Sequence, residues 1–129
     1  NLESLNLYNN NFTGEIPSEI GNLTNLQQLR LEYNQLTGEI PSSIGNLQLL
    51  SRLELEGNQL TGEIPSEIGN LTNLTIFLLN GNQLTGEIPQ SVCGLIESNN
   101  LDINEVFYEY VPSENVYSGG NDDLINTCD

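Results

Sequence analysis

Hydrophobic residues recur through the first three quarters of the chain at a fixed interval of 24 positions. Within each interval they occupy every second position over a short stretch, as in "LRLE" and "LELE". This alternation predicts a short strand with one buried face. The inward positions are Leu2, Leu5 and Leu7, then Leu26, Leu29 and Leu31, then Leu50, Leu53 and Leu55, then Leu74, Phe77 and Leu79. We expect each strand to pair with its copy in the next unit, which gives a parallel sheet.

The rest of each unit is equally regular. "NQLTGEIP" begins at Asn34, Asn58 and Asn82, and the near copy "NNFTGEIP" begins at Asn10. A buried amide is costly unless it is hydrogen-bonded, so these asparagines predict a ladder in which each side chain bonds the backbone of the adjacent coil. The glycine of the motif permits a bend, and its proline fixes an extended backbone. One unit therefore makes one coil.

The pattern "LxxLxLxxNxLTGxIPxxIGxL" covers residues 1–96. It resembles the plant-type class of leucine-rich repeat, found in extracellular receptor ectodomains and polygalacturonase-inhibiting proteins. The resemblance implies a β-rich α/β solenoid, a curved right-handed coil of 24-residue repeats with a parallel sheet on its concave side and a second short strand near "LTGxIP". It also implies binding through the repeat surfaces, usually without catalysis.

The repeat breaks in a fifth unit, where Val106 occupies the asparagine column. We expect a strand to survive in "LDIN", the ladder to end at Val106, and coil stacking to stop there for lack of an amide. The aromatic stretch "EVFYEYVPSENVY" can then fold over the last coil. The sequence thus predicts four repeats over residues 1–96, and a degenerate fifth repeat with a C-terminal cap over residues 97–129.

The two cysteines, Cys93 and Cys128, lie at or beyond the end of the repeats. Two free thiols are one interpretation. The alternative that we favour is a disulfide that holds the C-terminal segment onto the repeats, which requires an oxidising compartment. It predicts an extracellular or cell-surface location.

Two arginines and no lysine stand against 18 acidic residues, which gives a net charge of −16. Such a surface repels phosphate backbones and anionic lipid, so it excludes nucleic acid as a partner and favours cationic partners, including non-specific divalent cations. No apolar run approaches the ~20 residues of a membrane span. The chain has no histidine, nucleophile motif, phosphate-binding loop or metal-ligand spacing, so we expect no catalysis, no cofactor and no specific metal site.

The repeats differ most at the outward positions of the concave strands, where both arginines lie. We expect this face to bind a protein or glycan. A competing interpretation is that Arg30 pairs across strands with Glu54, and Arg52 with Glu54 or Glu56. The candidate partner-binding residues are Tyr8, Arg30, Glu32, Tyr33, Arg52, Glu54, Glu56, Ile76 and Leu78.

A different function class is a structural subunit. The first coil leaves apolar residues on an open end, and terminal repeats normally need a polar cap. Contact between this end and the C-terminal segment of another copy would build a filament. The residues of this predicted assembly end are Leu2, Leu5, Leu7, Phe12, Phe107, Tyr108 and Tyr110.

Two further columns have consequences for stability and function. Glu15, Glu39, Glu63 and Glu87 are expected to stack at ~4.8 Å and repel one another. Thr13, Thr37, Thr61 and Thr85 form a regular column that makes ice binding a minor alternative, although threonine belongs to the repeat consensus.

Overall fold

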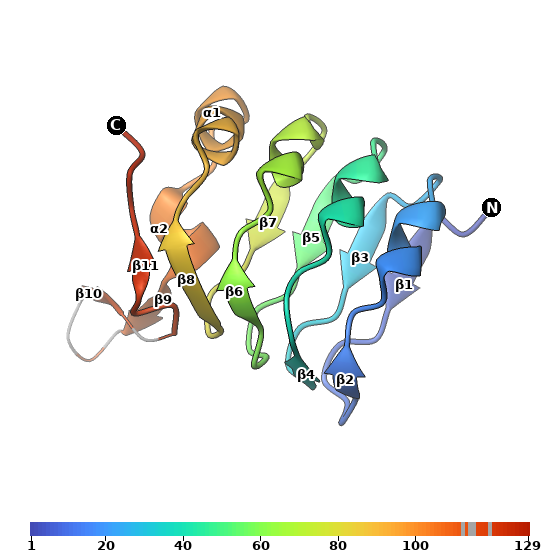
Figure 1. The fold of residues 1–129 in the computed structure, drawn as a ribbon, viewed down its shortest axis with the longest axis horizontal. Coiled ribbons are helices and arrows are strands. Elements are labelled where there is room, and N and C mark those ends of the chain that lie inside the picture. The colour runs from blue at the N-terminus through green and yellow to red at the C-terminus, as the bar shows by residue number, and fades with distance from the viewer. Residues whose placement is uncertain (112, 114–115, 119) are drawn as a thin grey trace.

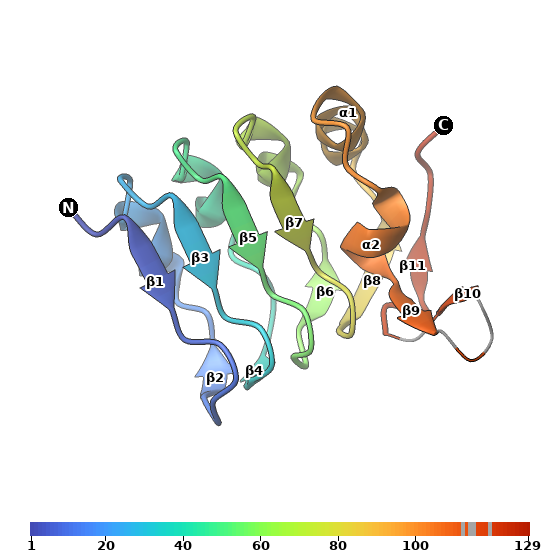
Figure 2. The same cartoon turned by 180° about the vertical axis from the view of Figure 1, so that it is seen from behind.

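The computed structural model describes residues 1–111, 113, 116–118 and 120–129, and its coils stack in chain order (Figure 1). One sheet runs along the solenoid (Figure 2) in the strand order β1-β3-β5-β7. Its parallel strands pair residues 24 apart, for example Leu5 with Leu29. This confirms the predicted repeat and its parallel sheet. The strands are β1 (Ser4–Asn6), β3 (Gln28–Arg30), β5 (Arg52–Glu54) and β7 (Ile76–Leu78).

A second strand follows in each coil on the opposite side of the solenoid (Figure 1), as the repeat resemblance implied. Two parallel ladders form here, β2-β4 and β6-β8-β11. The strands from the repeats are β2 (Thr13–Glu15), β4 (Gln35–Thr37), β6 (Thr61–Glu63) and β8 (Gln83–Glu87).

The predicted stack of repeat glutamates is wrong, because these ladders have a different register from that of the concave sheet. Residues 22 apart are paired, so Glu15 lies opposite Thr37 and Glu63 opposite Thr85. An isolated bridge places Glu39 opposite Thr61 in the same way. Successive glutamates are therefore diagonal neighbours, about 7–8 Å apart rather than directly opposed.

Each coil closes with a helical segment. Three are 3₁₀-helices, η1 (Ser18–Asn22), η2 (Ser42–Asn46) and η3 (Ser66–Asn70), and the fourth is the α-helix α1 (Gln90–Ser98). A proline in an extended conformation precedes each one. A Cβ atom on Gly45 would lie 2.6 Å from the Cβ of Glu67 in the next coil. Glycine is required there because neighbouring helical segments touch.

The asparagine ladder forms as predicted at Asn34, Asn58 and Asn82, whereas Asn10 is exposed and bonds only carbonyls of its own coil. The side-chain oxygen of Asn58 accepts from the backbone N–H of Leu36 at 3.1 Å. Its amide nitrogen donates to the carbonyls of Leu31 and Leu55 at 3.0 and 3.1 Å. Asn34 and Asn82 make the equivalent bonds in their coils. Each amide thus satisfies backbone groups of two adjacent coils inside a leucine core.

The predicted end of this ladder is wrong. Asn121, from the C-terminal segment, occupies the next rung. Its oxygen accepts from the N–H of Leu84 at 2.9 Å, and its nitrogen donates to the carbonyls of Leu79 and Phe107 at 3.0 and 2.9 Å. Val106, which occupies the asparagine column in the sequence, is buried instead. Asn121, which is distant in sequence, therefore supplies the rung that is missing from the asparagine column of the repeats.

The expected strand in "LDIN" is also absent. Asp102 begins the short helix α2 (Ile103–Phe107), and its carboxylate accepts from the N–H of Asn104 at 2.8 Å. An aspartate at this position satisfies a backbone N–H that has no partner within the helix, which favours helix over strand. α2 consequently takes the place beside β7 that a fifth strand would occupy (Figure 2).

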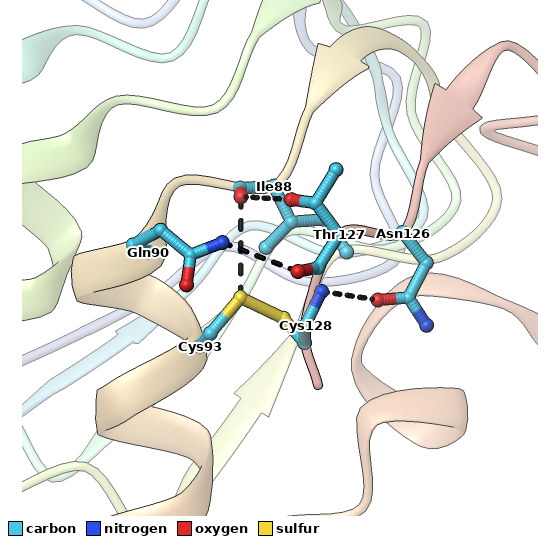
Figure 3. Close-up of a disulfide and its surroundings, with 6 residues drawn as sticks. All are labelled: Ile88, Gln90, Cys93, Asn126, Thr127 and Cys128. Carbon is cyan, nitrogen blue, oxygen red and sulfur yellow. Dashed lines mark hydrogen bonds between the residues drawn. A yellow bond between two sulfur atoms is a disulfide. The ribbon is translucent and has the colours of Figure 1, made fainter.

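The cap covers the fourth coil. Phe107 is fully buried against Phe77, with ring centroids 6.1 Å apart. β9 (Glu109–Val111) pairs with β10 (Val116–Ser118), and β11 (Leu124–Ile125) joins the ladder of β8. The predicted disulfide is confirmed, because Cys93 and Cys128 are bonded and join α1 to the segment that follows β11 (Figure 3).

Candidate binding site on the concave face

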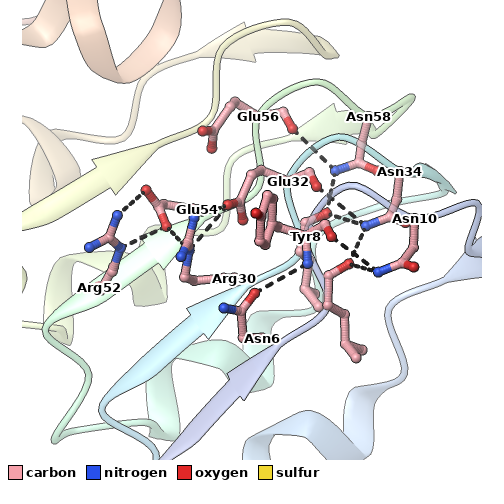
Figure 4. Close-up of polar contacts among 12 residues, drawn as sticks. Asn6, Tyr8, Asn10, Arg30, Glu32, Asn34, Arg52, Glu54, Glu56 and Asn58 are labelled. Atoms are coloured by element: carbon pink, nitrogen blue, oxygen red, sulfur yellow. Dashed lines mark hydrogen bonds and ion pairs between the residues drawn. The ribbon is translucent and has the colours of Figure 1, made fainter.

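Both arginines and two glutamates of the concave sheet form one ion-pair cluster (Figure 4). Arg30 lies 2.6 Å from Oε1 of Glu32 and 2.7 Å from Oε2 of Glu54, measured from its Nη2 and Nε atoms respectively. The Nε atom of Arg52 lies 2.7 Å from the same Glu54 oxygen. The predicted pairs of Arg30 and Arg52 with Glu54 are therefore confirmed. Tyr8 covers the cluster on one side, with its ring centroid 4.8 Å from the Arg30 guanidinium carbon.

The cluster stabilises its charged forms. Burial disfavours the ionised form of Glu54, but the hydrogen bond and charge of Arg52, together with those of Arg30, outweigh it and lower the pKa of Glu54. A hydrogen bond to Glu32 raises the pKa of Arg30, and a hydrogen bond to Glu54 raises the pKa of Arg52. The two arginines hold Glu54 ionised.

The sequence did not predict how deeply the three glutamates are buried. Their exposed fractions are 2% for Glu32, 5% for Glu54 and 7% for Glu56. Alternation along the strands placed these side chains on an outward face, and carboxylates on such a face are normally solvated. The sequence feature that could have indicated this burial is the presence of Tyr8, Arg30 and Arg52 at neighbouring positions of the face, because long side chains that lie side by side can cover a carboxylate.

Glu56 differs from the other two. Burial raises the pKa of Glu56 to about 7, a hydrogen bond with its own backbone opposes the rise, and the nearby carboxylates of Glu54 and Glu32 add to it. Within the described part of the chain, the Oε2 atom of Glu56 is buried without a hydrogen-bond partner, and so is the Oε2 atom of Glu32. These are the two unsatisfied carboxylate oxygens of the site.

The apolar candidates lie at the C-terminal end of the same face. Ile76 and Leu78 are half-buried rather than exposed as expected. They line a hollow of about 170 Å³ between β7 and α2, which Leu101 and Val106 complete from the other side. The hollow was not predicted, because it exists only where a helix replaces the expected fifth strand.

Tyr33 lies apart from the predicted assembly residues, of which Leu5, Leu7 and Phe12 line one apolar hollow of about 270 Å³ at the first coil. Tyr33 is 57% exposed, and a Cβ atom on Gly57 would lie 2.5 Å from its ring. Leu2 and Phe12 are also exposed, at 46% and 47%. Leu5, Leu7 and Tyr108 are half-buried, Phe107 is fully buried under the cap, and the side chain of Tyr110 lies outside the described part of the structure.

Two family models for leucine-rich repeats match the chain. One, "Leucine Rich repeats (2 copies)", matches residues 1–47, and the other, "Leucine Rich Repeat", matches residues 49–71 and 73–95. The chain belongs to the leucine-rich-repeat family. No curated protein matches this leucine-rich-repeat chain in sequence.

Solved structures of plant proteins are similar to this chain. One is the LRR ectodomain of the Arabidopsis receptor kinase HAESA with an IDA peptide hormone ligand, at 36% identity and a TM-score of 0.76, covering 99% of this chain and 18% of that chain. Another is the BIR2 ectodomain from Arabidopsis thaliana, at 31% identity and a TM-score of 0.78, covering 95% of this chain and 56% of that chain. A plant ice-binding protein has 35% identity and a TM-score of 0.67, and the match covers 70% of this chain and 30% of that chain.

The chain thus spans between about a sixth and slightly more than half of these three proteins. Among its described helices, none is long and apolar enough to cross a bilayer. In the part of the chain that the structure describes, no three or more histidine, cysteine, aspartate or glutamate side chains are arranged to hold a metal ion.

Proposed function

We propose that this leucine-rich-repeat chain binds a protein or peptide through its concave face and acts without catalysis. The observation that carries the proposal is the contrast between two surfaces of one repeat. "TGEIP" is copied in every coil, whereas the concave positions change from coil to coil and combine an ion-pair cluster with an apolar hollow. Apolar and aromatic contacts next to fixed charges are typical of protein-binding surfaces.

The structural neighbours support the same class of function. HAESA is seen with a peptide hormone, and RGFR1 with RGF2, in structures that share 36% and 45% identity with this chain. A glycan ligand, which the sequence also allowed, has no such support. We also propose an extracellular location, which the disulfide and the ectodomain neighbours favour.

Two alternatives have less support. Assembly into filaments through the ends stays a prediction from the sequence, and the comparisons lend it none. Ice binding is represented by one neighbour, but the threonine column of this chain is interrupted. Thr37, Thr61 and Thr85 each lie opposite a glutamate of the preceding coil, so the column is not an unbroken array of threonines.

A peptide-display selection on the immobilised protein tests the proposal. Selected peptides should bind the unmodified chain and lose at least about tenfold in affinity to Leu78→Asp, because a charge in the apolar hollow removes a desolvated contact. Leu49→Asp is the control for the introduced charge, since Leu49 is exposed, at 49%, and lies outside the concave strands. Equal loss in both variants, or in neither, would show that binding occurs elsewhere.

A further inference from the structure

The ion-pair cluster and the neighbouring Glu56 are together one cation short. Arg30 and Arg52 supply two guanidinium groups, whereas Glu32, Glu54 and Glu56 supply three carboxylates that lie within electrostatic reach of one another. Among the described residues, none forms an ion pair with Glu56. The Oε2 atoms of Glu56 and Glu32 are both buried without a hydrogen-bond partner there. Burying an ionised carboxylate without a partner is costly, so Glu56 favours a cationic group from outside the chain, and the second oxygen of Glu32 can bond the same group.

The two carboxylates belong to adjacent coils. Glu32 and Glu56 occupy equivalent positions 24 residues apart, and the N–H of Tyr33 donates to the carbonyl of Glu56 at 2.9 Å. Strands so paired are about 4.8 Å apart, a separation that one planar group can span. A guanidinium has five N–H donors in a fixed fork and can bond both carboxylates at once, whereas an ammonium is a compact point charge.

Aromatic side chains flank the pair. Tyr8 is 48% exposed and already lies against one guanidinium, that of Arg30 (Figure 4). The ring of Tyr33 lies against Gly57, the residue that follows Glu56. Aromatic faces attract guanidinium groups, so these rings favour an organic cation. A metal ion is disfavoured, since no group of three ligating side chains occurs in the described part of the chain.

We propose that Glu56 and Glu32 form a binding site for the guanidinium group of an arginine side chain in the protein or peptide ligand. The inference rests on the proposed function and names the chemistry that this ligand must carry. The net charge of −16 attracts such a ligand over a longer range. Both carboxylates lie just beyond the ends of β3 and β5 and are buried, so binding requires a rotation of the Glu56 side chain that brings its unpaired oxygen to solvent.

Binding should depend on pH through Glu56. The charged groups that face it are Glu32 and Arg30 from the preceding coil and Glu54 from its own strand. The following coil presents the uncharged side chain of Asn80, whose amide donates to the carbonyl of Glu105. Protonation of Glu56 removes the charge that the guanidinium would neutralise, and its pKa of about 7 places this change near neutral pH.

The test uses the full chain and three short capped peptides, Gly-Arg-Gly, Gly-Lys-Gly and Gly-citrulline-Gly, titrated by NMR at low salt. Citrulline has the shape of arginine without its charge. At about pH 8 the arginine peptide should bind about tenfold more tightly than the citrulline peptide and at least about threefold more tightly than the lysine peptide. At about pH 5.5 the preference for arginine should fall, because Glu56 is then protonated.

Glu56→Gln should reduce arginine binding to the level of citrulline and abolish the pH dependence. Glu63→Gln is the control, because it removes the same charge from an exposed residue of β6. Equal affinity for all three peptides, or an equal loss in both variants, overturns the inference. If displayed peptides still depend on Leu78 in that case, the proposed function stands without it.

Discussion

At the scale of single residues, Glu56 couples the concave face to the stability of the fold. A carboxyl group whose folded-state pKa of about 7 lies above its ordinary value of 4.5 stabilises the fold below pH 4.5. That contribution is lost as pH rises through the folded pKa, because the unfolded chain then holds fewer protons than the folded chain. Glu54 has the opposite effect. Because its pKa is lowered in the folded state, its contribution to stability is present above its ordinary pKa of 4.5 and is lost as pH falls below that value.

We therefore expect the free energy of unfolding to fall by up to roughly 3 kcal/mol between about pH 4.5 and pH 8, from the size of the Glu56 shift. Urea denaturation across this range measures it. Glu56→Gln should flatten the profile, while Glu63→Gln should leave its slope unchanged. A slope that persists in Glu56→Gln would mean that the dependence comes from the total charge instead.

At the scale of elements, a residue from the cap completes the asparagine ladder. Asn121→Ala should cost about 3 kcal/mol or more of stability, because it leaves buried backbone groups of Leu79, Leu84 and Phe107 without their bonds. Asn10→Ala is the comparison, since Asn10 is exposed and bonds only carbonyls of its own coil. It should cost less than about 1 kcal/mol. Similar losses in the two variants would contradict the structural role of Asn121.

The disulfide between Cys93 and Cys128 also holds the cap on the fourth coil, through a covalent bond. It joins residues separated by 35 positions, and on the loop-entropy model such a closure contributes about 3–4 kcal/mol through the unfolded state. Cys93→Ser with Cys128→Ser should show this loss in urea denaturation. Reductant should lower the stability of the unmodified protein but not that of the double variant. An unmodified protein that is indifferent to reductant would contradict the expectation.

At the scale of the whole molecule, the net charge of −16 makes the acidic residues repel one another. The glutamates of the second ladder lie diagonally, each opposite a threonine, so they do not form a stacked column that would bind divalent ions strongly. Raising salt from about 10 to 100 mM shortens the screening length from about 30 to about 10 Å and should raise the melting temperature. Calcium and sodium chloride should act alike at equal ionic strength. A shift specific to calcium would reveal a site that this register does not provide.

The sequence by itself determined the repeat, the parallel concave sheet and the ladder of Asn34, Asn58 and Asn82. These features follow from local periodicity, because each coil contacts only its neighbours and identical units must stack identically. The same regularity located both arginines on one face and allowed the pairs of Arg30 and Arg52 with Glu54 to be predicted.

The tertiary structure decided the features that depend on packing between coils or on the cap, apart from the disulfide of Cys93 with Cys128, which the sequence predicted. Asn121 reaches the ladder from 37 positions beyond Leu84, and no local pattern encodes that distance. The two-residue offset of the second ladder and the burial of Glu56 arise from the way neighbouring coils pack on one another. Periodicity fixes which residues are equivalent, but packing between coils sets their distances and solvation, and these set the charge of the candidate site.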